Sequence, residues 1–235
     1  MGCSSSKHVD QFVPIDEMVY INHLKTKFPS VNTVESLKIY SKFIKNSLID
    51  VRIKDGMISK NYIDDNDMLT TGVNPFNVFA RFGACVMPNI VDQSILKEYK
   101  DSFVICHNKP ENDENWNVET FTAASMAGPD SNGPGHVFIT TKNLHWSYFN
   151  VLTIVLEGRY EFLLKMKRAA LLYTESRGWK NPGFFFHVFP HNSVQSLHLH
   201  IIDMDNLGFQ FEKNAYKNLS IDDAIIVASH NMFQS

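Results

Sequence analysis

Hydrophobic side chains recur at helical intervals through residues 151–177. The positions of the apolar residues in this stretch fit one face of a helix, which predicts one long amphipathic helix. They are Leu152, Val155, Leu156, Leu163, Met166, Ala170 and Tyr173. Gly178 follows directly and Pro182 lies just beyond, and both residue types are typical of the chain after a helix C-terminus.

Four stretches around this expected helix have the pattern of β-strands. Residues 101–108 (DSFVICHN) alternate between faces, and residues 136–141 (HVFITT) are rich in β-branched and aromatic side chains. Residues 183–192 (GFFFHVFPHN) and 196–203 (SLHLHIID) follow the helix as two further strands. This order of elements favours an α+β fold, in which an antiparallel sheet is packed on one face by helices.

Polar stretches separate these elements. Residues 111–117 (ENDENWN) are expected to form a loop, and residues 127–135 (AGPDSNGPG) a mobile loop before the strand at His136. The glycines of the second stretch are not a phosphate-binding loop, because no Gly-Lys-Ser/Thr follows them.

The first half of the chain has a weaker pattern. Residues 32–49 have helical spacing, with Asn32 as the expected N-cap and Glu35 placed to reach back to it. Residues 50–63 (DVRIKDGMISKNYI) predict two short strands around an Asp55-Gly56 turn.

The composition is that of a globular protein. With 235 residues, 44% of them hydrophobic, the chain is long enough for one domain of ordinary size and an extension. We assign residues 1–15 to a flexible tail, 16–95 to an N-terminal extension of unknown role and 96–235 to the main domain. The net charge of −3 argues against a non-specific nucleic-acid binder, which is normally basic.

The cysteines and the apolar stretches exclude other classes. Cys3, Cys85 and Cys106 are too few and too irregularly spaced for a disulfide framework or a zinc ribbon, so reduced thiols are expected. No stretch reaches the roughly 18 apolar residues of a membrane-spanning helix.

The N-terminus, MGCSSSK, carries an acylation pattern. Gly2 followed by Ser6 fits N-myristoylation after removal of Met1, and the adjacent Cys3 suits palmitoylation. One myristoyl chain binds membranes only marginally, so a second chain on Cys3 would supply the stable anchor. In a eukaryotic host the pattern predicts attachment to the cytoplasmic face of a membrane. The alternative is an unmodified, disordered tail on a cytoplasmic protein.

Two histidines in SLHLHIID are the main candidates for chemistry. On a strand, Ser196, His198 and His200 share one face, while the intervening leucines and isoleucines point into a core. Three interpretations remain open. The pair could lie on a solvated strand face, bind a metal with a further ligand such as His187 or His191, or attack phosphorus through one imidazole.

Two blocks of sequence bear on this choice. NSVQSLHLHII resembles the signature of the histidine triad (HIT) nucleotide-binding superfamily, with its central histidine at His198 and its last at His200. Asn192 and Ser193 match the polar-Ser-Val element of that family. PGHVFITTKN resembles the family's earlier strand and places His136 where many members keep an additional active-site histidine. The resemblance covers roughly residues 100–205.

The resemblance implies an activity and a role for each of these residues. His198 would attack the α-phosphorus of a nucleotide or dinucleotide and form a nucleotidyl-histidine intermediate, which water or another acceptor then resolves. His200, Asn192 and Ser193 would stabilise the phosphate oxygens. His136 would orient a neighbouring ring or carry a proton to the leaving group. Covalent catalysis by histidine needs no metal or other cofactor.

Ser196 departs from the pattern, because the first histidine of the triad belongs at this position. As a weaker, neutral phosphate ligand it implies reduced activity or a different substrate preference. The alternatives are a catalytically weak nucleotide-binding protein and a metal-binding protein. The sequence leaves open whether a phosphoramidate, a dinucleoside polyphosphate, an adenylylated end or a cap dinucleotide is the substrate. It also leaves open whether the protein is a monomer or a homodimer.

Two further expectations concern residues near the site. Phe103 and Ile105 are candidates for an apolar nucleoside pocket. His187 and His191 are expected to be structural rather than catalytic.

Overall fold

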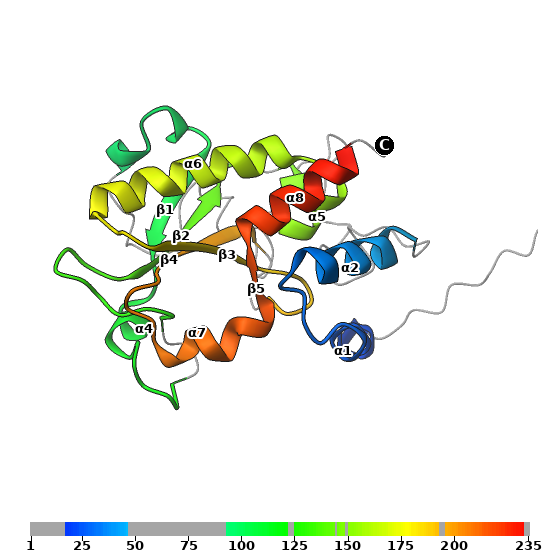
Figure 1. The fold of residues 1–235 in the computed structure, drawn as a ribbon, viewed down its shortest axis with the longest axis horizontal. Helices are drawn as coiled ribbons and strands as arrows, with labels where there is room; N and C mark the ends of the chain where they lie inside the picture. The colour runs from blue at the N-terminus through cyan, green and yellow to red at the C-terminus, as the bar shows by residue number, and fades with distance from the viewer. Residues whose placement is uncertain are drawn as a thin grey trace, which may run out of the picture.

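The computed structural model describes residues 17–46, 93–121, 125–143, 145–148, 150–192 and 196–232. They form an α+β fold in which a five-stranded antiparallel sheet packs against helices, as the sequence predicts (Figure 1). The strands are β1 (Phe103–His107), β2 (His136–Thr141), β3 (Pro182–His187), β4 (His198–Asp203) and β5 (Asn218–Ser220). Their order in the sheet is β1-β2-β4-β3-β5. The first four confirm the predicted strands, whereas β5 is an addition.

Helices precede, connect and follow these strands. The longer helices are α1 (Glu17–Lys27), α2 (Val34–Asn46), α6 (Tyr160–Arg177) and α8 (Ile221–Met232). The shorter helices are α4 (Pro110–Glu114), α5 (Val151–Leu156) and α7 (Phe209–Asn214), with 3-10 turns η2 (Gln93–Tyr99), η3 (Trp146–Tyr148) and η4 (Ala215–Lys217). Among the helices described, none is both long and apolar enough to cross a membrane.

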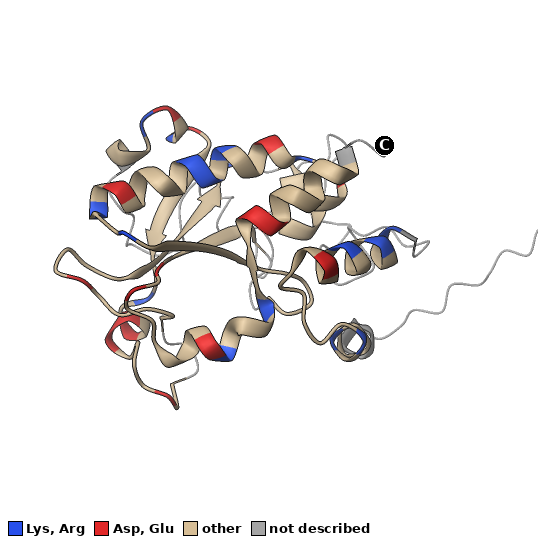
Figure 2. Ribbon diagram, viewed as in Figure 1, with Lys and Arg blue, Asp and Glu red and all other residues tan. Residues whose placement is uncertain are grey.

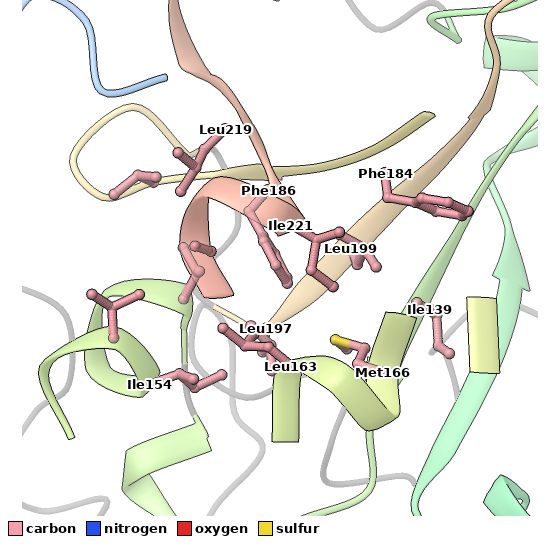
Figure 3. Close-up of a cluster of buried hydrophobic side chains, with 14 of the residues drawn as sticks. Ile139, Ile154, Leu163, Met166, Phe184, Phe186, Leu197, Leu199, Leu219 and Ile221 are labelled. Carbon is pink, nitrogen blue, oxygen red and sulfur yellow. The ribbon is translucent and has the colours of Figure 1, made fainter. Parts of the chain in front are cut away.

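One face of the sheet carries the main hydrophobic core. Figure 1 shows α6 and α8 together on one side of the sheet, and α4 and α7 on the other. In Figure 3, Ile139 and Leu199 of the sheet meet Leu163 and Met166 of α6, and all four side chains are fully buried. The alternation of strand side chains therefore sends these apolar residues toward the helices and their neighbours in sequence to the opposite face.

The single helix expected over 151–177 is two helices. Asn150 caps α5 through its side chain, which accepts from the Thr153 N–H at 3.1 Å. The break comes at Gly158, whose φ of 64° is in the left-handed region that side-chain-bearing residues disfavour. Gly178 is confirmed as the left-handed C-terminal cap of α6, with φ 69°. The apolar spacing runs through the break, so the periodicity alone hides it.

Two local predictions in the polar segments are also corrected. Residues 111–117 do not form only a loop, because the short helix α4 begins at Pro110 and covers most of the polar run. The N-cap of α2 is Thr33 rather than Asn32: the Thr33 hydroxyl accepts from the Ser36 N–H at 3.2 Å, and the Ser36 hydroxyl accepts from the Thr33 N–H at 3.0 Å. The hairpin expected over 50–63 lies outside the described residues.

The loop that leads into β2 is fastened to the end of α6, in contrast to the mobile loop expected there. Arg177 donates to the Asp130 carboxylate at 2.5 Å and to the Gly133 carbonyl at 3.0 Å, and the Trp179 indole donates to the second Asp130 oxygen at 2.7 Å. Burial acts to raise the pKa of Asp130, but these hydrogen bonds and the Arg177 charge outweigh it and lower the pKa. These bonds hold the loop that leads into β2 and thereby help to position His136, the first residue of that strand.

The described helices of the N-terminal extension belong to the same core as the sheet. Leu37 and Ile44 of α2 are fully buried in one cluster with Val227 of α8. His191, in the turn after β3, donates to the Phe28 carbonyl between α1 and α2 at 2.7 Å. The extension therefore packs directly on the main domain.

Candidate active site

Four histidines lie on the sheet face opposite α6 and α8. The register of β2 and β4 places His136 across from Ile202 and Phe138 across from His200, and directly paired residues share a face. The register of β3 and β4 pairs Phe185 with His200, so His187, two residues along β3, is on this face too. We call His136, His187, His198 and His200 the histidine cluster.

The predicted orientation of the HxH pair is confirmed, with one change. Leu199 and Ile201 are fully buried in the core on the helix side, so His198 and His200 face the other way. Ser196 lies two residues before the first residue of β4, so it is not part of the strand face expected from the alternation. Its side chain is nevertheless buried, with 3% exposed.

A chain of hydrogen bonds fixes the protonation of two of the rings. The Met126 N–H donates to Nδ1 of His136 at 3.0 Å, so a neutral His136 must carry its proton on Nε2. That nitrogen lies 2.9 Å from Nδ1 of His200, which therefore accepts. The remaining His200 nitrogen, Nε2, is then an N–H donor. It is buried and has no hydrogen-bond partner among the described residues.

His198 is oriented by the backbone that precedes it. Its Nδ1 lies 2.7 Å from the carbonyl oxygen of Ser196, an acceptor, so Nδ1 carries the proton and Nε2 carries the lone pair of the neutral ring. Thr140, the residue paired with His198 on β2, donates its hydroxyl to the Leu197 carbonyl at 2.5 Å. The segment that holds His198 is therefore itself tied to β2. Because the acceptor is a main-chain carbonyl, this orientation does not depend on the residue type at position 196.

His187 is a member of the cluster that sequence reasoning assigned to structure only. Its ring centroid lies 4.3 Å from that of His200, and its Nε2 donates to the side-chain oxygen of Asn218 at 3.0 Å. The sequence already indicates that His187 and Phe185, two residues apart on a strand, share a face. Only the pairing of β3 with β4 shows that this face is the one that carries His200. His191 is structural, as expected, because its ring contacts Phe28 and Tyr216 rather than the cluster.

The cluster is neutral at pH 7 and lies in a positive environment. Burial, with the His198 charge, lowers the pKa of His136 to about 3, and burial with the Lys217 charge lowers that of His187 to about 2. The pKa values of His198 and His200 are also lowered, chiefly by burial, and Lys217 contributes to both. Lys217 precedes β5 and was not singled out from the sequence. Its position favours an anionic ligand.

An apolar wall adjoins the cluster. Val104 and Cys106 of β1 form a buried group with Phe138 of β2, whose ring centroid is 5.8 Å from that of His198. Phe103 and Ile105, expected in a nucleoside pocket, point instead into the core on the helix side. The prediction selected the wrong face of β1, because residues 103–106 are all apolar and the sequence does not show which of them share a face with the histidines.

The remaining predicted site residues are placed only in part. Asn192 is half-buried in the segment that joins β3 to β4. Ser193 and the acylation candidates Gly2 and Cys3 lie outside the described residues.

The hydrogen bonding also bears on the metal interpretation. The part of the chain that the structure describes holds no group of three or more His, Cys, Asp or Glu residues arranged to bind a metal ion. In the cluster, the lone pairs of His136 and His200 are already directed at N–H donors. A site with three histidine ligands would require these bonds to break, so the residues present do not fit a metal.

Comparison of the whole chain with models of protein families, with curated proteins and with solved structures gave no match. The geometry of the histidine cluster is therefore the basis on which the function of this chain is inferred.

Proposed function

We propose that the protein is a nucleotide hydrolase or nucleotidyl transferase of the histidine triad type, with His198 as the nucleophile. One observation carries the proposal: the 2.7 Å hydrogen bond from Nδ1 of His198 to the Ser196 carbonyl. It holds the ring in the tautomer whose Nε2 has the lone pair, and burial lowers the pKa of the ring so that it stays neutral. Both properties are required of an attacking imidazole.

The proposed reaction has two steps. First, the Nε2 lone pair of His198 forms a bond to the α-phosphorus. The bond from phosphorus to the leaving oxygen or nitrogen breaks, its electron pair stays with the leaving group, and that group takes up a proton. Second, the oxygen of water bonds to phosphorus and loses a proton, and the P–N bond breaks with its electrons returned to Nε2. The product is a nucleoside monophosphate.

Two other groups of the cluster are suited to stabilise the phosphate charge. The buried Nε2–H of His200 has no partner among the described residues, and His200 is adjacent to the nucleophile, with ring centroids 4.8 Å apart. Lys217 directly precedes Asn218, which bonds to His187 of the cluster, and its positive charge contributes to the lowered pKa of His198 and His200. Donors arranged before the substrate binds stabilise a transition state without reorganisation cost. His136 has the role of holding His200 in its donor tautomer.

The test is turnover of an adenosine phosphoramidate, a diadenosine polyphosphate and a cap dinucleotide, with and without a chelator. We expect release of nucleoside monophosphate from at least one of them, unchanged by the chelator. Quenching with alkaline detergent during turnover of a labelled substrate should trap nucleotide on the protein through a P–N bond that survives base and is lost on later treatment with acid. Nucleotide binding without release from any member of the panel would contradict catalysis and favour the alternative, a catalytically weak nucleotide-binding protein. Activity lost to the chelator would contradict the metal-free mechanism.

We also propose that the chain is acylated at Gly2 and Cys3 in a eukaryotic cell and attached to the cytoplasmic face of a membrane. The support is the MGCSSSK pattern. Gly2→Ala should release the protein into the soluble fraction, and Cys3→Ser should weaken retention, because one acyl chain alone binds marginally. Fractionation of cells expressing each variant measures this. An unchanged distribution of Gly2→Ala would show that the anchor is absent.

A further inference from the structure

A cavity lies away from the histidine cluster, where α2 meets α5 and α8. Its volume is about 490 Å³. Figure 1 shows α2, α5 and α8 near one another at one end of the molecule. The lining residues are Lys38, Ser41, Lys42, Lys45, Leu156, Val227, His230 and Asn231. We call this the α2–α8 cavity.

The α2–α8 cavity is basic. Lys38, Lys42 and Lys45 are exposed and recur at i, i+4 and i+7, so they line one side of α2. No carboxylate is among the described residues that line the cavity. The surrounding stretch, residues 17–46, holds five lysines and two glutamates in a chain whose net charge is −3 (Figure 2). Three lysine side chains around one hollow create a positive potential that attracts anions.

A buried hydroxyl at this cavity also points to a ligand. Ser41 is 4% exposed, and its Oγ has no hydrogen-bond partner among the described residues. A serine in a helix commonly bonds to a carbonyl of the preceding turn, so a buried hydroxyl without such a bond is unusual. At the opposite wall, the Asn231 amide donates to the Val155 carbonyl at 2.9 Å, which fixes that side chain.

We propose that the α2–α8 cavity binds the phosphate monoester headgroup of an acidic membrane lipid. The volume exceeds that of one phosphate and accommodates a phosphorylated ring. A membrane source is favoured by Ile39, which follows Lys38 on α2 and is 53% exposed, an apolar side chain suited to the interface. It is also favoured by the acylation pattern at Gly2 and Cys3, because a basic contact with acidic lipids adds to the membrane binding that acyl chains supply. The proposal is independent of the chemistry at His198.

The experiment uses unacylated full-length protein and sedimentation with vesicles. The vesicles are phosphatidylcholine alone, phosphatidylcholine with phosphatidylserine, and phosphatidylcholine with phosphatidylinositol bisphosphate at the same total charge. We expect binding to the bisphosphate vesicles to be about tenfold tighter than to the phosphatidylserine vesicles, since monoester oxygens accept several charge-assisted hydrogen bonds. Soluble inositol trisphosphate should compete. Equal binding to the two acidic vesicles would overturn the proposal, because it would indicate diffuse charge attraction.

Two variants distinguish specific binding in the cavity from a general attraction of the protein's positive charge to acidic vesicles. Ser41→Ala leaves the charge unchanged and removes no internal hydrogen bond, so it should melt as the wild type does while binding bisphosphate vesicles about tenfold more weakly. Lys42→Ala should weaken binding by a similar factor. Lys180→Ala, which removes an exposed lysine outside the cavity, is the control and should bind as wild type. Wild-type binding by Ser41→Ala would contradict the site. Binding of inositol trisphosphate without vesicle binding would contradict the membrane source.

Discussion

His198→Ala should lower nucleotide turnover by at least about 1,000-fold and abolish the trapped covalent intermediate, because it removes the atom that bonds to phosphorus. The protein should remain folded, since the ring is only half-buried and its hydrogen-bond partner at Ser196 is a main-chain carbonyl, which the substitution does not remove. The measurement is single-turnover release of nucleoside monophosphate, together with thermal melting of each variant.

Two matched variants make this result specific. His191→Gln removes a histidine outside the cluster but keeps an N–H donor for the Phe28 carbonyl, so turnover should match the wild type. Ser196→Ala keeps the carbonyl that orients His198, so turnover should fall far less than in His198→Ala. Full activity of His198→Ala would rule out this residue as the nucleophile. A loss in Ser196→Ala as large as in His198→Ala would show that the serine hydroxyl, rather than the backbone, carries the effect.

Acidification should destabilise the protein steeply between about pH 6.5 and pH 4, because the folded state keeps the histidine cluster neutral. For each buried histidine the folded pKa lies below its unfolded value. Below pH 6.5 the unfolded chain therefore binds protons that the folded chain does not, and stability falls as the pH falls. The stability lost through His136 keeps increasing until the pH reaches the folded pKa of this ring, about 3. For His187 the loss continues to a folded pKa of about 2. Above the unfolded-state pKa of histidine, both states are neutral and these rings do not change stability with pH.

The expected size of this effect is large. Each such histidine lowers the free energy of unfolding by about 1.4 kcal/mol per pH unit, so at about pH 5 His136 and His187 together remove about 4 kcal/mol. That is a major part of the stability of an ordinary domain. Urea unfolding at a series of pH values measures the slope.

A glutamine at position 136 provides the control for this slope. His136→Gln replaces a titrating ring with a neutral amide that both donates and accepts, so the pH slope should decrease by up to about 1.4 kcal/mol per unit. A slope unchanged in His136→Gln would show that this ring is not neutral in the folded protein below pH 6.5.

The local sequence was sufficient to predict elements whose signals lie within a few residues. The alternation in SLHLHIID predicted both the strand β4 and the shared face of His198 and His200, because strand periodicity leaves only two faces and the apolar set must be buried. Gly178 marked the end of α6 for an equally local reason, since the left-handed cap favours glycine. Where a local signal was ambiguous, as at Asn32 and Thr33, the prediction was off by one residue.

The tertiary structure decided which distant residues meet. His187 and His191 are near neighbours in sequence, yet the pairing of β3 with β4 places the first against His200, and the packing of the α1–α2 turn takes the second away. The two rings of His136 and His200 are 64 residues apart, and only the register of β2 with β4 brings them within 2.9 Å.

The sequence by itself therefore determined the fold class, the strands β1 to β4 and the faces of the HxH pair, because these follow from side-chain periodicity and local backbone preference. Only the tertiary structure decided the tautomers of the histidine cluster, the position of Lys217 beside it and the basic cavity between α2 and α8. The reason is physical: hydrogen-bond direction, burial and charge proximity are properties of the space between elements, and that space is set by how the elements pack.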